Sequence, residues 1–166
     1  MHNDFVVVGP AADAAEVKRA GSAADAFTRI AAAKLPFASR ADESGTNTKE
    51  LAIWEAAGIE PEGSWYIETG QGMGETLTIA SQKQAYTLSD RGTYLATDNL
   101  DLGLLVEGGR DLLNPYHVIV VKAEGTNREC AQEFSDWITS PATQDAIGRF
   151  GVAEFGEPLF VPDAKG

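Results

Sequence analysis

The sequence predicts an α/β domain of the three-layer sandwich type, in which helices cover both faces of a sheet. Short β-branched or aromatic runs alternate along the chain with segments whose apolar residues recur at helical spacing, and this alternation is typical of such domains. The 166 residues are 43% hydrophobic and 23% charged. This is enough for one ordinary domain, or for one lobe of a two-lobed protein with part of the other.

The first half of the chain is expected to hold two strands and two helices. A β-branched run closed by Gly9 and Pro10 indicates a buried strand that ends in a turn. Ser22 and Asp25 have the spacing of a capping box, which marks the start of a helix. Gly58 is typical of the residue that follows a helix C-terminus. The expected elements are strands at residues 4–8 and 35–39 and helices at 22–34 and 46–57.

The second half continues the alternation and ends in helices. Ser140 and Pro141 predict the start of a short helix, because proline is favoured at the first helical position. The strand-like runs near Phe5 and Val118 bracket the alternating middle, as two crossings between lobes would. The other expected elements are a helix through 77–81, a short helix after Asp90, a helix at 126–137, and strands at 85–88, 102–106 and 116–121.

Composition narrows the function classes. The net charge is −12, and no run rich in Lys and Arg occurs, so a nucleic-acid partner is not expected. A small anion remains possible, because distant surface charge is screened over roughly 10 Å. No stretch reaches the ~18 apolar residues of a membrane span, and the first residues lack the basic and hydrophobic regions of a signal peptide.

Cys130 and the tryptophans on helical segments are expected to be packed. Cys130 has no second cysteine or nearby histidine, so a buried or half-buried helix position is favoured over a disulfide or a metal site. Trp54 and Trp137 fall on helix faces with aliphatic neighbours, which predicts core packing for both.

The loop from Ser39 to Thr46 combines one guanidinium, three hydroxyls and a glycine directly before a predicted helix. The first turn of a helix has four unpaired N–H groups and about half a positive charge, which suits an anion. Arg40 adds charge in a forked geometry, and Gly45 lets the backbone approach a ligand. Ser44 and Thr46 are equally good helix caps, so residue chemistry alone leaves both interpretations open.

A second loop, Gly70 to Thr76, also delivers glycines and a hydroxyl to the start of a helix. Two such helix ends converging on one point could surround a tetrahedral anion. A nucleotide is not indicated, because Glu75 stands where a dinucleotide loop needs glycine and no Gly-Lys-Ser/Thr ending occurs.

Catalysis is not expected. His2 lies at a chain end and His117 within an apolar run, and no Gly-x-Ser-x-Gly elbow or zinc-type spacing is present. Scattered carboxylates in so acidic a chain are mostly solvated or paired with basic groups. The acidic residues weighed as acid/base candidates are Asp42, Glu43, Asp90 and Glu107.

Segments along the whole chain resemble the tungstate-binding receptors of bacterial ABC-type tungstate importers. The sequence departs from that pattern at Ala41 and Ser89, where glycine and threonine are expected. The matching segments are 3–10, 39–46, 65–66, 70–74, 86–94, 114–116 and 158–160.

This resemblance implies a type II periplasmic binding protein, with two α/β lobes that close on tungstate, and on molybdate less well, and a membrane permease as partner. It implies no cofactor beyond this oxyanion ligand. Arg40 would be the charged clamp, and Thr46 and Thr76 hydroxyl donors to the tungstate oxyanion. Asp90 and Arg91 would form an ion pair at the hinge or contact the ligand. The other ligand-binding candidates are Ser39, Ser44, Gly45 and Gly74.

The resemblance also implies a domain plan. Residues 8–114 would be the ligand-binding second lobe, and residues 1–7 and 115–166 the hinge strands and C-terminal part of an incomplete first lobe. Family members carry a leader and a further N-terminal stretch with a Thr-Thr-Thr-Ser motif ahead of Asn3, so this chain is expected to lack its N-terminal segment. The C-terminal apolar face would then fold back or drive self-association. That face includes Phe134, Trp137, Ile138 and Ile147.

Ligand chemistry separates the possible oxyanions. Tungstate has four acceptor oxygens and no proton near neutral pH, so its site should offer donors only. Phosphate often keeps a proton and gains from one acceptor. Asp42 or Glu75 turned toward the ligand would therefore favour phosphate or a cation. The alternatives left open are another oxyanion, or a truncated, non-binding half that serves as an interaction or structural domain.

Overall fold

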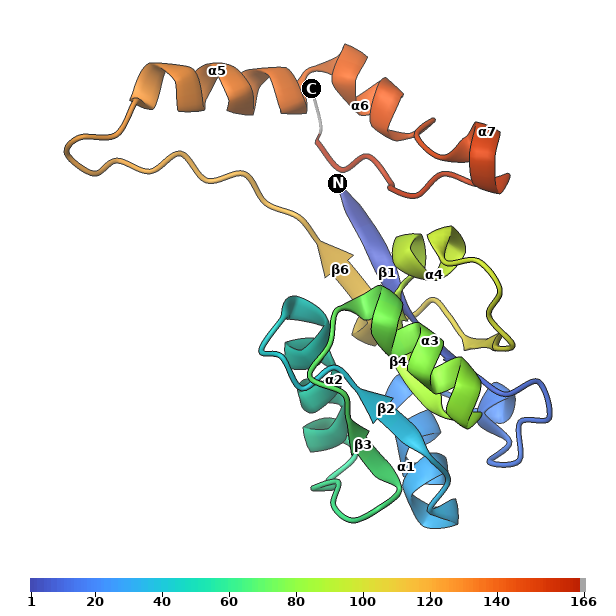
Figure 1. The fold of residues 1–166 in the computed structure, drawn as a ribbon. Coiled ribbons are helices and arrows are strands. Elements are labelled where there is room, and N and C mark those ends of the chain that lie inside the picture. Colours follow the sequence, from blue (N-terminus) through green and yellow to red (C-terminus); the bar gives the residue numbers. More distant parts are fainter. Residues whose placement is uncertain (165–166) are drawn as a thin grey trace. The chain divides into compact units, whose positions relative to one another are not determined.

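The computed structural model describes residues 1–164 and divides the chain into two compact units, residues 4–113 and residues 1–3 with those from 114 onward. The chain passes between the units twice, through strand β1 (His2–Gly9) and near strand β6 (Leu113–Pro115) (Figure 1). These two strands pair with each other. The predicted boundaries at 8 and 114 describe the lobes of a longer receptor and remain a prediction.

The larger unit is built on a mixed sheet with the order β3-β2-β4-β1-β5. Strand β2 is parallel to both of its neighbours, whereas β1 is antiparallel to β4 and β5. The register of β1 against β5 shifts between Val7 and Val8. Besides β1, the strands of this path are β2 (Phe37–Ser39), β3 (Tyr66–Glu68), β4 (Tyr86–Asp90) and β5 (Gly103–Val106).

Two apolar clusters lie on opposite faces of the sheet, because successive side chains of a strand point to opposite sides. Phe5 and Val7 of β1 join one cluster, and Val6 and Val8 join the other. All four are buried, as expected for a strand covered on both faces. The predicted three-layer α/β architecture is confirmed.

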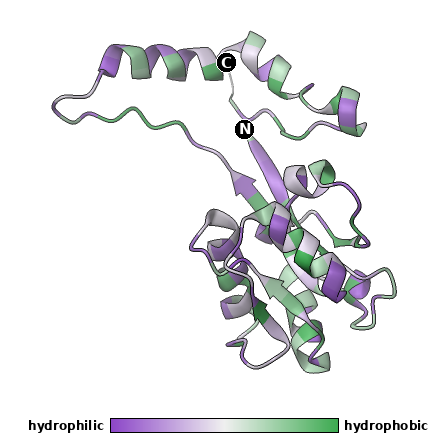
Figure 2. Cartoon of the chain, in the orientation of Figure 1, coloured by the Kyte–Doolittle hydropathy of each residue, from purple (hydrophilic) through white to green (hydrophobic). Residues whose placement is uncertain are grey.

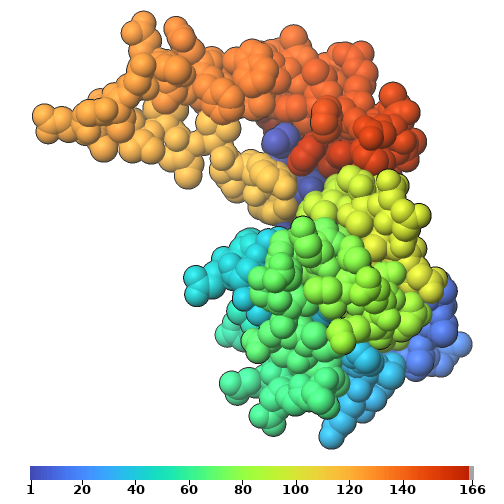
Figure 3. Space-filling view, viewed as in Figure 1, coloured from blue at the N-terminus to red at the C-terminus, as the bar shows by residue number. Residues whose placement is uncertain are grey.

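Helices α1 and α2 contribute to the first cluster and α3 to the second; Figure 3 views this unit from the side of α3 and α4. Serine and aspartate caps begin three of the helices: Ser22, Ser44 and Asp90 accept hydrogen bonds from the third following amide. The helical segments are η1 (Val17–Arg19), α1 (Ala23–Ala33), α2 (Gly45–Ala56), α3 (Met73–Lys83), α4 (Arg91–Ala96) and η2 (Arg110–Leu112).

An aromatic group forms the centre of the first cluster. The ring of Trp54 lies 4.4 Å from that of Phe27 and 5.2 Å from that of Phe37, centroid to centroid. Trp54 is 1% exposed, which confirms its prediction as a core residue. Edge and tilted contacts of this kind add to the free energy of burial.

The smaller unit contains helices α5 (Arg128–Thr139), α6 (Pro141–Ile147) and α7 (Val152–Phe155). The strand expected at 116–121 is wrong: these residues form neither helix nor strand. A strand needs a neighbour for its backbone N–H and C=O groups, and no described strand pairs with this segment. Ile119 is accordingly 80% exposed.

Two packing predictions on α5 are also wrong. Cys130 is exposed, and Trp137 is 57% exposed although it contacts Phe134 at 5.6 Å between ring centroids. Figure 2 shows apolar and polar residues alternating along this helix. Its apolar residues have helical spacing, as predicted, but no described core covers them. In residues 1–164, no helix has both the length and the apolar character needed to cross a membrane.

Candidate functional site

Both candidate loops begin at the same edge of the sheet. Strands β2 and β3 are parallel and in register, with Ser39 opposite Glu68, so their carboxyl ends lie side by side. The Ser39–Thr46 loop leads from β2 into α2, and the Gly70–Thr76 loop leads from β3 into α3. The structure therefore brings together the two helix N-termini that the sequence placed 28 positions apart, from Gly45 to Met73.

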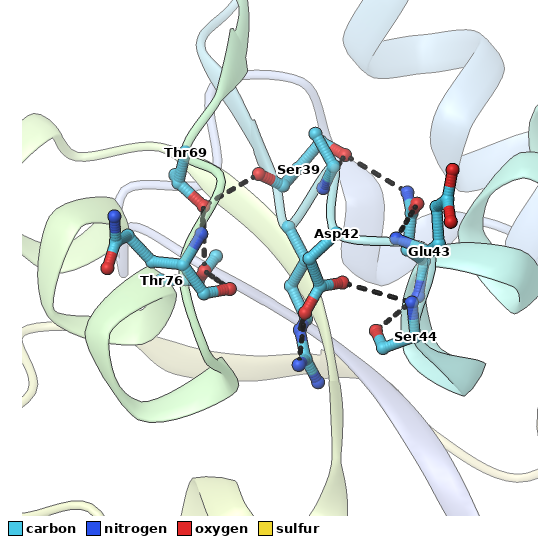
Figure 4. Close-up of polar contacts among 10 residues, drawn as sticks. Ser39, Asp42, Glu43, Ser44, Thr69 and Thr76 are labelled. Carbon is cyan, nitrogen blue, oxygen red and sulfur yellow. Dashed lines mark hydrogen bonds and ion pairs between the residues drawn. The ribbon is translucent and has the colours of Figure 1, made fainter.

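Thr69 joins the two loops, as Figure 4 shows. Its amide and its hydroxyl both donate to the carbonyl of Ser39, at 2.9 Å each. Its hydroxyl also lies 2.9 Å from that of Thr76. Sequence reasoning missed Thr69. Its position between a strand and a glycine loop was the available signal.

The N-terminus of α2 has donors to spare. Ser44 accepts from the amides of Asn47 through its hydroxyl, at 3.3 Å, and of Thr48 through its carbonyl, at 2.8 Å. The amides of Gly45 and Thr46 have no hydrogen-bond acceptor among residues 1–164. The Thr46 hydroxyl likewise forms no hydrogen bond with the described residues, although Thr46 is only 8% exposed.

The N-terminus of α3 is similar. Gly72 accepts from the Thr76 amide at 2.9 Å and offers no side-chain cap. The amides of Met73, Gly74 and Glu75 therefore lack an acceptor within the described part of the chain. The Glu75 carboxylate folds back toward Gly72: its Oε2 lies 2.8 Å from the position that a Gly72 side-chain carbon would take.

Arg40 is engaged by Asp42 in this structure. Its Nε and Nη2 donate to Asp42 Oδ2 at 3.1 and 2.5 Å, and Asp42 Oδ1 accepts from the Ser44 amide at 3.2 Å. Burial alone would raise the pKa of Asp42, but hydrogen bonds from Ser44 and Arg40 outweigh it and hold this pKa below its ordinary value. Asp42 thus faces the guanidinium that the ligand would need.

A buried carboxyl lies beneath the first loop. Glu50 of α2 is 2% exposed. Its Oε2 accepts from the Ser39 hydroxyl at 2.7 Å, and its Oε1 accepts from Tyr66 Oη at 2.7 Å and Trp54 Nε1 at 3.0 Å. Burial raises the pKa of Glu50, and the hydrogen bonds from Ser39, Tyr66 and Trp54 offset only part of that rise.

This carboxyl makes stability depend on pH in a definite direction. Because its folded-state pKa lies above the ordinary value of 4.5, the folded chain binds more protons than the unfolded chain between 4.5 and the raised pKa. The contribution of Glu50 to the free energy of unfolding is therefore full below pH 4.5 and falls as pH rises through the raised pKa.

Glu50→Gln is expected to remove this decrease in the free energy of unfolding with rising pH. Urea denaturation of both chains from about pH 4 to 8 measures it, as the difference between their free energies of unfolding at each pH. A difference that stays constant over the whole range would contradict the assignment.

Arg91 forms an ion pair with Asp4 at the start of β1. Arg91 Nε and Nη2 each donate to one oxygen of Asp4 at 2.7 Å, and Nη2 also donates to Glu107 at 2.6 Å. Asp90 instead caps α4 by accepting from the Thr93 amide at 2.8 Å. The hydrogen bonds that Arg91 donates to Asp4, opposed by burial, raise the pKa of Arg91, so its charge supports the start of β1.

Comparison with known proteins identifies the family of this chain. The model of the PBP superfamily domain matches residues 1–142. The chain belongs to the PBP superfamily.

Two relatives are named as anion-binding proteins. The tungstate-binding protein TupA of Peptoclostridium acidaminophilum is 45% identical over 99% of this chain and 59% of its own length. A Haloferax volcanii protein, named as a candidate ABC transporter anion-binding protein, is 52% identical over 99% of the chain and 50% of its own length. The chain therefore spans half to three fifths of these curated relatives.

A solved structure confirms the fold. The tungstate-binding protein TupA of Desulfovibrio alaskensis superposes with a TM-score of 0.81 and 40% identity, over 99% of this chain and 69% of that one. The predicted resemblance to tungstate receptors is confirmed at the level of family and fold. The individual ligand contacts stay predictions.

Proposed function

We propose that this chain is the ligand-binding part of the solute receptor of an ABC-type tungstate importer, and that it binds the oxyanion without catalysis. One observation carries the proposal: two helix N-termini, each with unpaired amides, open from adjacent parallel strands and are tied together by Thr69. Helix N-termini favour anions through their free N–H groups and their dipole. The TupA relatives bind tungstate by name.

The donors divide into two groups in this proposal. The amides of Gly45, Thr46 and Gly74 and the Thr46 hydroxyl have no hydrogen-bond partner among residues 1–164, so they can bind directly. Arg40 keeps Asp42 on its Nε and Nη2 and offers its remaining N–H groups to the ligand, and Thr76 must release its contact with Thr69. Ser39 and Ser44 belong to the same loop, where Ser44 caps α2. The tungstate oxyanion would be bound through Arg40, Thr46 and Thr76.

The wider assignment follows the family. We propose that residues 8–114 are the second lobe, that residues 1–7 and 115–166 are the hinge and the C-terminal part of the first lobe, and that the receptor works in the periplasm with a membrane permease. Molybdate would be a weaker ligand.

Isothermal titration with tungstate, molybdate, sulfate and phosphate tests the proposed ligand. Tungstate is expected to bind tightest, because the unpaired groups at the site are donors and the carboxylate of Asp42 is occupied by Arg40 and Ser44. Tightest binding of phosphate would instead show that Asp42 or Glu75 accepts from a protonated ligand. Absence of heat with all four anions would contradict the proposal for this chain.

A second role is favoured by the exposed apolar residues of the smaller unit. Ile119, Phe134 and Trp137 are each at least half exposed, and such patches promote association. A chain that associates through them would be an interaction domain. Sedimentation velocity at several concentrations tests this. Association that weakens in Trp137→Ser supports it, and a monomer at every concentration contradicts it.

A further inference from the structure

The loop that carries Arg40 has an unusual backbone for its sequence. Ala41 and Glu43 both adopt the left-handed conformation, with φ of 47° and 60°, which residues other than glycine rarely occupy. Such conformations persist only where the surrounding structure enforces them. The direction of the Arg40 side chain depends on this backbone.

Side chains hold both residues in place. The Ala41 amide donates to Ser39 Oγ at 3.2 Å, and the Glu43 amide donates to Asn47 Oδ1 at 3.1 Å. Asn47 Nδ2 also lies 3.5 Å from Ser39 Oγ. The hydroxyl of Ser39 therefore receives two N–H groups, which fills both of its acceptor positions.

Only one hydrogen remains on that hydroxyl, and it points to Glu50 Oε2 at 2.7 Å. Ser39 is fully buried and has no donor left for a ligand. A serine that can rotate could not hold Ala41, because its lone pairs would turn with it. The acceptor that stops this rotation is Glu50.

We infer that Glu50 is a positioning residue of the anion site: through the Ser39 hydroxyl it fixes the Ala41 backbone and so aims Arg40. Glu50 lies one helix turn before Trp54 on α2 and accepts from Trp54 Nε1, so the same carboxylate is also part of the core. The expected effect on anion binding rests on the proposed function, whereas the hydrogen bonds that fix the loop do not. Ser39 then acts on the loop rather than on the oxyanion.

Glutamine at position 50 cannot replace the carboxylate. Trp54 Nε1 can only donate, and Ser39 needs an acceptor on the opposite side, whereas an amide has an acceptor on one side and donors on the other. With its oxygen toward Ser39, glutamine loses only the Trp54 hydrogen bond, because the Tyr66 hydroxyl can accept from the amide. Glu50→Leu, which offers no acceptor to Ser39, is therefore the variant that breaks the connection. Tyr66→Phe is the matched control, since it removes a 2.7 Å hydrogen bond to the other oxygen, Oε1, and keeps the hydrogen bond between Ser39 and Glu50.

The first measurement needs no ligand. In the full chain, amide hydrogen exchange at Ala41 is expected to be about tenfold faster in Glu50→Leu and in Ser39→Ala than in the wild type. In Tyr66→Phe it stays within about twofold, as do the amides of Val7 and Leu88 in all variants. Ser39→Ala breaks the same connection from the other end, so a poorly folded Glu50→Leu does not prevent the test. Unchanged exchange at Ala41 in Ser39→Ala overturns the inference.

The second measurement is tungstate titration. Glu50→Leu and Ser39→Ala are each expected to raise the Kd about tenfold, and the double variant no more than either alone, because both break one connection. Additive losses would overturn the inference and indicate two independent effects. A wild-type chain that binds no oxyanion would refute the proposed function, while the exchange result would still decide the role of Glu50.

Discussion

Arg40→Ala is expected to weaken tungstate binding by about a hundredfold or more, the range found when a buried charge partner is truncated. Two physical effects add. The ligand loses the guanidinium, whose fork matches tetrahedral oxyanions. Asp42 meanwhile loses the partner that neutralises it at 2.5 Å, so an unpaired carboxylate is left beside the anion. Titration calorimetry of the variant and the parent chain measures the loss.

Two further variants make that result specific. Arg19→Ala removes an exposed arginine that pairs with Glu16 in η1, and binding should stay within about twofold because surface charge is screened. Arg40→Ala combined with Asp42→Asn should bind better than Arg40→Ala alone if the freed carboxylate repels the ligand. Equal losses of tungstate affinity for Arg19→Ala and Arg40→Ala would show that Arg40 acts only through its contribution to the net charge.

Elements specified by local chemistry were predictable. The caps Ser22, Ser44 and Asp90 begin the helices expected from them, since a cap acts only on the next three residues. The apolar run of β1 was predictable because both faces of that strand are covered. Strand β3 was missed because three residues, Tyr66 to Glu68, are too few for a period to show.

The run at 116–121 shows the limit of local patterns. Its β-branched residues have strand propensity, yet that propensity measures packing against neighbours, and no described strand offers it any. Trp137 and Cys130 failed for the same reason: helical spacing predicts which face of α5 is apolar, but not what covers it. The helix itself was predictable from its period.

At the candidate site, the two loops could be predicted and their internal partners could not. Helix starts and glycines appear in sequence, but the contact of Arg40 with Asp42 depends on left-handed residues that no local preference favours. Glu50 was missed altogether, because a glutamate inside a helix is usually solvated. Its burial becomes visible only when Ser39 and Tyr66 are brought to it from two strands.

Trp54→Ala is expected to lower the free energy of unfolding by about 3–5 kcal/mol, the usual loss for a large buried aromatic residue. The indole is 1% exposed and packs against Phe27 and Phe37, so alanine leaves a cavity between two helices and the sheet. It also takes the Nε1 donor from Glu50, which worsens the burial of that carboxyl.

Trp137→Ala is the matched control, since the same side chain is removed from a position that is 57% exposed. The free energy of unfolding of this variant should fall by less than about 1 kcal/mol, because little apolar area returns to water. Urea denaturation monitored by circular dichroism compares the two variants. Similar losses at both positions would mean that α5 is covered in solution, by another copy or by further chain, and that the exposed apolar surface of the smaller unit is an occupied interface.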